Sequence, residues 1–436
     1  MSYSIAGIDV HKKMLAVATA DVETAGEYQF QERKFGANPS DLRAMAEWLV
    51  EQGVEEVVME STAQYWRPVW HALEQHWQPE RRKREGAGKM AGTLHLAQAQ
   101  SNRARHGRKN DFEDAQRLVK RLVAQELVLS FVPNAEQRLW RTVSHRKYQL
   151  TRDKVRVRNQ MEGLLEETNI KLTSLVSDLF GVSGRRMLRG IADGESDPAV
   201  LAALADHRLR ATPEQLRDAL GACAQLHPVY RQLVEMFLGS LKQMEEQIET
   251  LDKQIAKLLE PYQDAVQRLA EVPGLGVDSA QQIIAQVGPA AVAFPCAKSL
   301  ASWVGVCPGR DESAGESKSN RSPKGNRALR RVLNQAAHAA IRYRGSIFEL
   351  TFRRLLPRLG YQQAAWAIAH RLCNLIWILL HKGDRYREMG PEVRAKSQKA
   401  RVSRMIRELR KLGYQVDSMQ LAAGSARWAR EAASTR

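Results

Sequence analysis

The first quarter of the chain alternates short apolar runs with charged turns, which is typical of strands in a mixed α/β domain. Residues 3–11 and 14–20 are two apolar runs joined by a charged turn, and they predict a hairpin. An amphipathic stretch behind an Asn/Ser capping region predicts a helix at 38–52. The full set of predicted elements is strands at 3–11, 14–20, 28–35 and 55–60, and helices at 38–52 and 111–124. We therefore expect the chain to begin with an α/β domain.

Two longer stretches, residues 134–168 and 228–261, are charged and carry Leu, Met and Ile at three- and four-residue steps. Segments of this length predict either a coiled-coil arm suited to dimerisation or two ordinary helices packed on the body of the protein. Residues 170–225 lie between them and contain several glycines, which favours a helical insert. The middle of the chain is therefore expected to be all-helical.

The last part of the chain predicts a mainly helical domain that begins near Tyr262. A helix there leads into Val272-Pro-Gly-Leu-Gly276 and a second apolar helix at 277–287, which is the shape of a helix-hairpin-helix motif. Gly274 and Gly276 would let the backbone approach a phosphate, with amides of the following helix pointing towards it. The alternative is a tight turn between helices without a ligand. Further helices are predicted at 296–306 and 327–343, around a polar loop at 308–326, with a basic tail from residue 394.

Length and charge bound the class of protein. The chain has 436 residues and a formal net charge of +17, which is enough for two or three domains with cores of their own. A positive excess of this size favours a polyanionic partner, because neutralised phosphates release counterions. A basic ribosomal-type or membrane-surface protein is the alternative. The expected divisions are an α/β domain at 1–130, a helical region at 131–261, a C-terminal domain at 262–390 and a basic tail at 391–436.

The cysteines and the apolar runs restrict the cellular setting. The four cysteines share no CxxC spacing, so neither a zinc site nor a disulfide framework is indicated. The sequence has no run of about eighteen apolar residues and no apolar leader, which argues against secretion and membrane insertion. We expect a cytoplasmic protein with reduced thiols and no membrane partner.

Four acidic residues of the α/β domain are placed where a metal-dependent nuclease would hold them. Asp9 interrupts the first strand, Glu60 ends a later strand, and Asp111 and Asp114 share one helical face at i,i+3 spacing. The order of the elements around them, three strands, a helix and another strand, is that of a ribonuclease-H-like domain. Carboxylates that converge from separate segments are what two-metal phosphoryl chemistry needs. The four acids therefore predict a site for divalent metal.

Each acid also has an ordinary structural interpretation. Asp111 as a helix N-cap, with Asp114 as the acid at position N3, needs no metal. Glu60 could be a solvated strand end. Asp9 is harder to explain, because a carboxylate flanked by aliphatic residues is costly to bury without a partner. We interpret the four together as a metal site and leave out Glu113, which points to a different helical face.

The loop at 308–326 is polar, rich in lysine and unusually long for a connection between two helices. Ser313 is followed by Gly315, which would let the backbone bend and present the hydroxyl. A serine hydroxyl is a poor nucleophile at neutral pH and needs charge stabilisation. The cations available to clamp a phosphate near it are Lys318, Arg321, Lys324 and Arg327. The alternatives are a flexible basic loop that only contacts phosphate, or a nucleophile at Ser317, Ser319 or Ser322.

Several short strings follow one another along the chain in a specific order. They are Gly7-Ile-Asp-Val-His-Lys12, Met59-Glu-Ser-Thr62, Lys109-Asn-Asp-Phe-Glu-Asp-Ala115, Val272-Pro-Gly-Leu-Gly276, Ala301-Ser-Trp-Val-Gly-Val-Cys-Pro-Gly309 with Glu312-Ser-Ala-Gly315, and Lys324-Gly-Asn326 with Leu329-Arg330. Their joint order resembles the IS110 family of insertion-sequence transposases, and the strings around Cys307 and Ser313 look closest to its IS1111 subgroup. The resemblance covers residues 5–125 and 262–385, whereas the insert at 170–225 and the basic tail depart from it.

The resemblance implies a fold, a chemistry and partners. It implies an N-terminal domain similar to the Holliday-junction resolvase RuvC, a coiled-coil arm and a C-terminal transposase domain. The site residues it implies are Asp9, Glu60, Asp111 and Asp114 as ligands of Mg²⁺, and Ser313 as the catalytic serine. Members of the family recombine donor and target DNA under the direction of a structured non-coding RNA, through a covalent serine–DNA intermediate. They work as homo-oligomers, from dimers to tetramers.

We therefore expect a DNA transposase that acts as an RNA-guided serine recombinase. Composition supports only a polyanionic partner, so the guide RNA follows from the resemblance alone. The first alternative is a metal-dependent, structure-specific DNA endonuclease in which water attacks and the serine loop only binds. The second is an architectural nucleic-acid-binding protein whose acidic tetrad is inactive.

Overall fold

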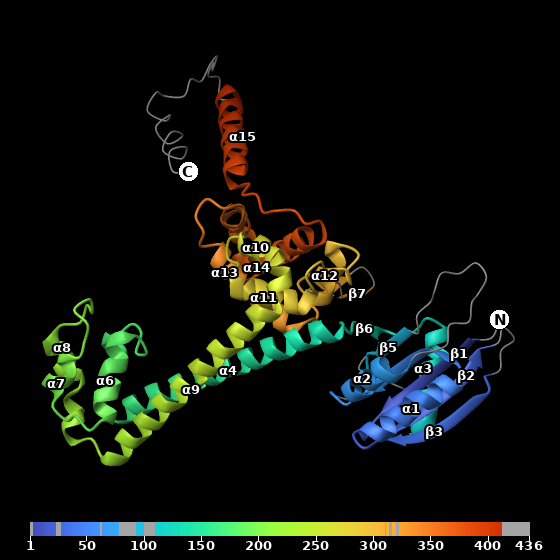
Figure 1. Ribbon diagram of the computed structural model, residues 1–436. Coiled ribbons are helices and arrows are strands. Elements are labelled where there is room, and N and C mark those ends of the chain that lie inside the picture. The colour runs from blue at the N-terminus through green and yellow to red at the C-terminus, as the bar shows by residue number, and fades with distance from the viewer. Residues whose placement is uncertain are drawn as a thin grey trace. The chain divides into compact units, whose positions relative to one another are not determined.

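The computed structural model describes residues 3–22, 28–61, 63–77, 93–99, 110–309, 311–313, 316–319 and 322–411. The chain divides into two compact units, Met1–Pro133 and Asn134–Arg436. Figure 1 shows the elements of both units. The first unit is mixed α/β and the second is almost wholly helical.

The first unit is built on a six-stranded sheet with the order β3-β2-β1-β4-β5-β6. Its strands are β1 (Tyr3–Val10), β2 (Met14–Val22), β3 (Phe30–Gly36), β4 (Val54–Ser61), β5 (Thr93–Ala97) and β6 (Leu129–Ser130). The first three strands form an antiparallel meander, while β4 runs parallel to β1 and β5 runs parallel to β4. The predicted hairpin and the two later strands are confirmed. The short strand β5 was not expected, because five residues carry too little periodicity to be recognised.

Helices cover both faces of this sheet, so β1 is buried on each side. Helices α1 (Pro39–Glu51) and α2 (Trp66–His76) pack on the face that carries Ile8 and Val10 of β1. Helix α3 (Asp111–Val123) packs on the other face, where Val119 meets Ile5. Each such buried aliphatic side chain contributes about 1.5–3 kcal/mol to folding. Because side chains alternate along a strand, Gly7 and Asp9 lie on the α3 face with Ile5.

The second unit contains a long pair of antiparallel helices, α4 (Ala135–Glu167) and α9 (Pro228–Leu258), which lie side by side (Figure 1). Their pairing is seen in two ion pairs, one between Lys154 and Glu245 at 2.6 Å and one between Lys147 and Asp252. Both long helices were expected. The pair forms within one chain, and dimerisation through it stays a prediction.

The connection between the two long helices is a small helical subdomain with its own core. It contains α5 (Leu172–Leu175), α6 (Val182–Ala192), α7 (Pro198–Ala203), α8 (Pro213–Ala219) and the 3₁₀ turn η1 (Gly221–Gln225). Leu188, Leu201 and Leu216 are buried together there with Val234 of α9. The expected helical insert at 170–225 is confirmed.

The remaining elements of the second unit form a compact helical body around one large apolar core. They are η2 (Glu260–Tyr262), α10 (Gln263–Ala270), α11 (Val277–Val287), α12 (Ala297–Val304), β7 (Asp311–Ser313), β8 (Glu316–Ser319), α13 (Arg327–Ala340), α14 (Ile347–His381) and α15 (Gly390–Lys411). The base of α4 belongs to this body, because Arg141 donates to the carbonyl oxygen of Ala285 at 3.2 Å.

Helix α14 is the one helix of the described residues whose length and composition would suit a membrane span, and half of the apolar window is buried in this body. It is broken at Gly360, which has φ of 73° and lies next to Leu359 on the wall of a cleft described below. The apolar character of α14 is explained by packing, because Ile368, Leu372 and Ile376 are fully or almost fully buried.

A candidate metal centre and a serine hairpin

Asp9 and Glu60 come from adjacent parallel strands and occupy the same register position, Asp9 of β1 opposite Glu60 of β4. Both face α3, because they alternate with Ile8 and Met59, which belong to the core on the α1 and α2 side. The two carboxylates therefore lie side by side near the C-terminal ends of these two central strands. The expectation that these strand ends point acids to a common edge agrees with this register.

Helix α3 brings Asp111 and Asp114 to the same face of the sheet. Its N-cap is Asn110, whose side chain accepts a hydrogen bond from the amide of Phe112 at 3.1 Å. The interpretation of Asp111 as the N-cap, with Asp114 at N3, is therefore wrong: Asp111 is the first helical residue and the cap is already supplied. Asp111 is free to direct its carboxylate towards β1.

The close approach of α3 to β1 depends on Gly7. A Cβ placed at Gly7 would fall against the carbonyl oxygen of Ala115 in α3, well inside van der Waals contact. Only glycine allows the helix backbone to come this near to the strand. Gly7 is two residues before Asp9 on the same face, so the contact that admits the helix also sets the separation of Asp9 from the acids of α3.

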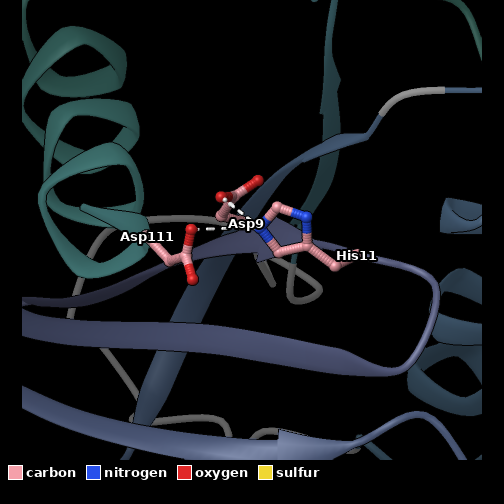
Figure 2. Close-up of side chains that lie close together, drawn as sticks. All are labelled: Asp9, His11 and Asp111. Atoms are coloured by element: carbon pink, nitrogen blue, oxygen red, sulfur yellow. Dashed lines mark hydrogen bonds and ion pairs between the residues drawn. The ribbon is translucent and has the colours of Figure 1, made fainter. Parts of the chain in front are cut away.

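His11 lies between two of the acids, as Figure 2 shows. Its Nε2 atom is 3.0 Å from Oδ2 of Asp9 and 3.2 Å from Oδ1 of Asp111. One ligand atom from each of these three residues lies within 4.8 Å of the others. On the other side of the cluster, Arg117 donates a hydrogen bond to Oδ1 of Asp114. An imidazole and a guanidinium thus lie against the carboxylates of the cluster, and neither His11 nor Arg117 was among the predicted site residues.

Burial raises the pKa of Asp9 above its usual range, with the charge of His11 acting in the opposite direction. Burial also raises the pKa of Glu60, opposed by the charge of Arg117. The Oε2 atom of Glu60 is buried and has no hydrogen-bond partner among the described residues. A buried carboxylate oxygen without a donor is costly, and a cation placed beside it would remove that cost.

The donor set fits a divalent cation on these grounds. Carboxylate oxygens from two strands and a helix converge, and Oε2 of Glu60 has no hydrogen-bond partner among the described residues. Oxygen ligands are what Mg²⁺ and similar hard cations prefer. Asp9 and Asp111, with Glu60 and Asp114 beside them, would hold the ion, and the imidazole of His11 offers one nitrogen. His11 was overlooked as a site residue. Its signal was the i,i+2 spacing from Asp9, which returns a side chain to the same face of a strand.

In the second unit, the polar loop expected at 308–326 contains a two-stranded hairpin. Strands β7 and β8 pair antiparallel, with Ser313 opposite Glu316 at the closed end. Ser313 is thus the last strand residue before the turn. Gly315 and Arg321 lie outside the described residues, and the side chains of Ser313 and Lys318 are not described either, so their roles stay predictions.

The base of this hairpin, by contrast, is tightly fixed. Gly305 and Gly325 have φ of 78° and 38°, and their backbones approach each other so closely that a side chain on either would collide with protein backbone. Arg330 of α13 donates to the carbonyl oxygens of Gly305 and of Pro323, the latter at 2.5 Å. The two ends of the hairpin are therefore tied together through one guanidinium.

Two further contacts extend this anchorage to α14. The guanidinium carbon of Arg330 lies 4.8 Å from the ring centroid of Trp366, and the indole Nε1 of Trp366 donates to Oγ of Ser322 at 3.1 Å. Asn326 caps α13 by accepting a hydrogen bond from the amide of Leu329 at 2.9 Å.

Lys324 and Arg327, the two cations of the expected phosphate clamp whose side chains are described, are exposed on the surface beside the base of the hairpin.

The glycines of the helix-hairpin-helix string differ from one another. Gly274 has φ of 88°, and a Cβ there would collide with the carbonyl oxygen of Ala336 and the amide of Ala340 in α13. Its close approach is therefore to protein backbone, which accounts for the glycine without a ligand. Gly276 precedes α11 and has open space where a Cβ would lie. A phosphate contact at either glycine stays a prediction.

A sheet of this order with acids gathered at one edge, followed by a largely helical second unit, is consistent with a RuvC-like transposase of the DEDD type. Comparison with known families agrees. A transposase family of DEDD type named for IS110 matches residues 6–170, and the family described as "Transposase IS116/IS110/IS902 family" matches residues 266–352. The chain belongs to this family of insertion-sequence transposases, whose members are enzymes that act on DNA.

Individual relatives support the assignment at low identity. A "Probable family 20 transposase" of Pseudomonas aeruginosa is 26% identical over 293 residues, covering 64% of this chain and 75% of the relative. The "Transposase for insertion sequence element IS1111A" of Coxiella burnetii is 23% identical over 286 residues, covering 64% and 68%. The "Transposase for insertion sequence element IS1328" of Yersinia enterocolitica is 25% identical over 281 residues, covering 63% and 72%.

Proposed function

We propose that this transposase cleaves and rejoins DNA by phosphoryl transfer to Ser313, with Mg²⁺ held by Asp9, Glu60, Asp111 and Asp114. The single observation that carries the metal part is that the buried Oε2 of Glu60, beside Asp9, has no hydrogen-bond partner in the part of the chain that the structure describes. The position of Ser313 at the turn of an anchored hairpin supports its role as nucleophile. The tetrad and the hairpin would both have to reach one phosphodiester, whether they come from one chain or from neighbouring protomers of a dimer or tetramer.

The proposed reaction has two balanced steps. In the first, Oγ of Ser313 forms a bond to phosphorus, the bond from phosphorus to one deoxyribose oxygen breaks, and the serine proton passes to the departing oxygen. In the second, the hydroxyl oxygen of an incoming strand forms a bond to the same phosphorus, the bond from phosphorus to Oγ of Ser313 breaks, and the hydroxyl proton passes to Oγ. A bound divalent cation supplies charge neutralisation at the phosphate oxygens. The exposed Lys324 and Arg327 would add charge-assisted contacts to the same oxygens.

The proposed partners are donor DNA, target DNA and a structured guide RNA. The net charge of +17 supports a polyanionic partner, and the family supports DNA. The guide RNA rests on the resemblance to the family alone. The placement in the IS1111 subgroup rests on the strings around Cys307 and Ser313, and the likeness to the Coxiella transposase adds support to it.

The proposal is tested by trapping the intermediate. Purified protein, guide RNA and target duplex are incubated with Mg²⁺, and a covalent protein–DNA adduct is sought on denaturing gels. We expect an adduct that is absent in Ser313→Ala and kept in Ser302→Ala, a matched change at an exposed serine of α12. An adduct that survives in Ser313→Ala would mean that the nucleophile is misassigned. Omitting the RNA tests whether it is required.

A second candidate function is a structure-specific endonuclease that acts by hydrolysis. The observation that favours it is that all four acids lie within the first unit, so a water nucleophile would need nothing from the serine hairpin. Hydrolysed ends without attached protein, formed equally by the wild type and Ser313→Ala, would support this candidate.

A further inference from the structure

A cleft of about 630 Å³ lies in the second unit between the two ends of the serine hairpin and helix α14. Its volume is within the range of clefts that bind small ligands, about 300–1,000 Å³. Val306 and Pro308 line it from the segment that leads into the hairpin, and Ser322 lines it from the segment that leaves it. The cleft is therefore part of the scaffold that carries Ser313, and neither the metal centre nor the phosphate clamp uses it.

The lining of this cleft combines an aromatic ring with amide groups. Trp366 contributes the ring, and Asn334, Gln362 and Gln363 contribute side-chain amides. Each amide offers both a donor and an acceptor of hydrogen bonds. The three amide residues are solvent-exposed, so these groups are available to a ligand. Trp366 is fixed in place by Arg330 and Ser322, which removes the entropic cost of ordering it on binding.

The cleft is also uncharged. No Lys, Arg, Asp or Glu occurs among the described residues that line it. The remaining polar residues are Ser322 and His370, and the pKa of His370 is lowered, chiefly by burial and further by the charge of Arg371, which favours the neutral imidazole. A lining without cations does not suit a phosphate. It suits a neutral, planar group with donors and acceptors along its edge, which describes a nucleobase.

The position of the cleft restricts which nucleobase it would meet. Ser313 is five positions after Pro308 in the chain, so the two are at most about 18 Å apart. That distance corresponds to about five base-pair steps along duplex DNA. A strand whose phosphate reaches the hairpin would thus have its nearest nucleotides within reach of the cleft.

We infer that this cleft binds one unpaired nucleobase of the DNA strand that lies at the serine hairpin. Trp366 supplies the stacking surface, and the amides of Gln362, Gln363 and Asn334 contact the edge of the base. A base held in this way would fix the register of the strand against the hairpin. The inference rests on the proposed function only in taking the hairpin to be where DNA lies, and it does not require Ser313 to be the nucleophile.

Photocross-linking tests the contact directly. A short DNA duplex carries one unpaired 5-iodouracil, and the full-length protein is irradiated with it, both as wild type and as Ser313→Ala. We expect a cross-link in the peptide of α14 that contains Trp366, identified by mass spectrometry, in both proteins alike. The same irradiation is repeated with an RNA duplex of the same sequence. A cross-link on that peptide with RNA but not with DNA would overturn the assignment to DNA. Cross-links confined to other peptides would overturn the site itself.

Affinity provides the second readout. We expect the duplex with one unpaired base to bind about tenfold more tightly than the fully paired duplex, which is the scale of one stacked base. The double variant Gln362→Ala/Gln363→Ala should lose most of this preference and keep its affinity for paired DNA. The matched control is Gln263→Ala/Gln267→Ala, at two exposed glutamines of α10 away from the cleft, which should keep the preference. Equal preference in both double variants would refute the inference, and because no adduct is scored, that result would leave the proposed nucleophile untouched.

Discussion

Asp9 and Glu60 are register partners on the parallel strands β1 and β4, so the fold holds two carboxylates side by side near the C-terminal ends of the two central strands of a buried sheet. Burial raises the pKa of each carboxyl, which means that their negative charges make the folded protein less stable. Proteins keep such arrangements where the charge is used, and here the Oε2 atom of Glu60 is left without a donor among the described residues.

Glu60→Gln should separate function from stability. We expect the variant to lose at least the 10–100-fold in metal affinity that removal of even an outer-shell partner costs. Its metal-free form should be no less stable than the wild type at about pH 7, because a neutral amide replaces a buried charge. Titration with Mn²⁺ followed by electron paramagnetic resonance measures the affinity, and thermal unfolding measures the stability. Glu113→Gln, at an exposed acid of α3, is the control and should change neither.

Gly7→Ala should damage the metal centre from a distance. The added methyl group would collide with the carbonyl oxygen of Ala115, so α3 must move away from β1. We expect a loss of about 1–3 kcal/mol in the free energy of unfolding, as for other overpacked sites, together with weaker Mn²⁺ binding. Urea denaturation and the same metal titration provide the measurements. Gly163→Ala, at an exposed helical glycine with open space around it, should be neutral or slightly stabilising. Unchanged metal affinity in Gly7→Ala would show that this contact does not set the site.

Glu245 should make the helical arm sensitive to acid. It accepts two hydrogen bonds from Arg185 of α6, at 2.9 and 2.5 Å, and these, with Lys154, lower its pKa to about 2. A depressed carboxylate pKa stabilises the fold above the unfolded pKa of 4.5, and that stability is lost as the pH falls towards about 2. We expect Glu245→Gln to cost about 1 kcal/mol near neutral pH, since the pair is partly solvated.

The measurement for Glu245 is the difference between wild type and variant in urea denaturation, compared at about pH 7 and at about pH 3. The difference should shrink at the lower pH, where the unfolded carboxylate is already protonated. Glu249→Gln, which breaks an exposed i,i+4 pair with Lys253 on the same helix, should have a smaller effect at both. A difference that stays constant or grows in acid contradicts the assignment.

Arg330→Lys should disturb the serine hairpin without removing a positive charge. The Nη1 atom of Arg330 donates to the carbonyl oxygens of Gly305 and Pro323 while the planar guanidinium lies over Trp366, and a lysine ammonium cannot keep that planar contact. A misplacement of about 1 Å at a reacting group can cost about 100-fold in rate. We therefore expect slower formation of the covalent adduct with little change in DNA affinity, measured by adduct kinetics and fluorescence anisotropy. Arg342→Lys, at an exposed arginine just after α13, is the control.

The sequence by itself determined most of the secondary structure and the list of acids. Periodicity located the β1–β2 hairpin, β4, and helices such as α11, whose bounds at Val277 and Val287 were predicted to the residue. These features are local, because they depend on residues three or four positions apart. The strings at Asp9, Glu60 and Asp111 likewise identified the family, since their order is a property of the chain alone.

Which side chains contact one another depends on the packing of distant segments in three dimensions. His11 and Asp111 are 100 residues apart in sequence, and their 3.2 Å contact depends on where α3 packs on the sheet. The N-cap at Asn110, the packing of Gly274 on α13 and the cleft beside Trp366 depend on geometry in the same way. Local pattern fixes which element forms, but register and close packing between distant segments fix the neighbours of each side chain, and no periodicity encodes those neighbours.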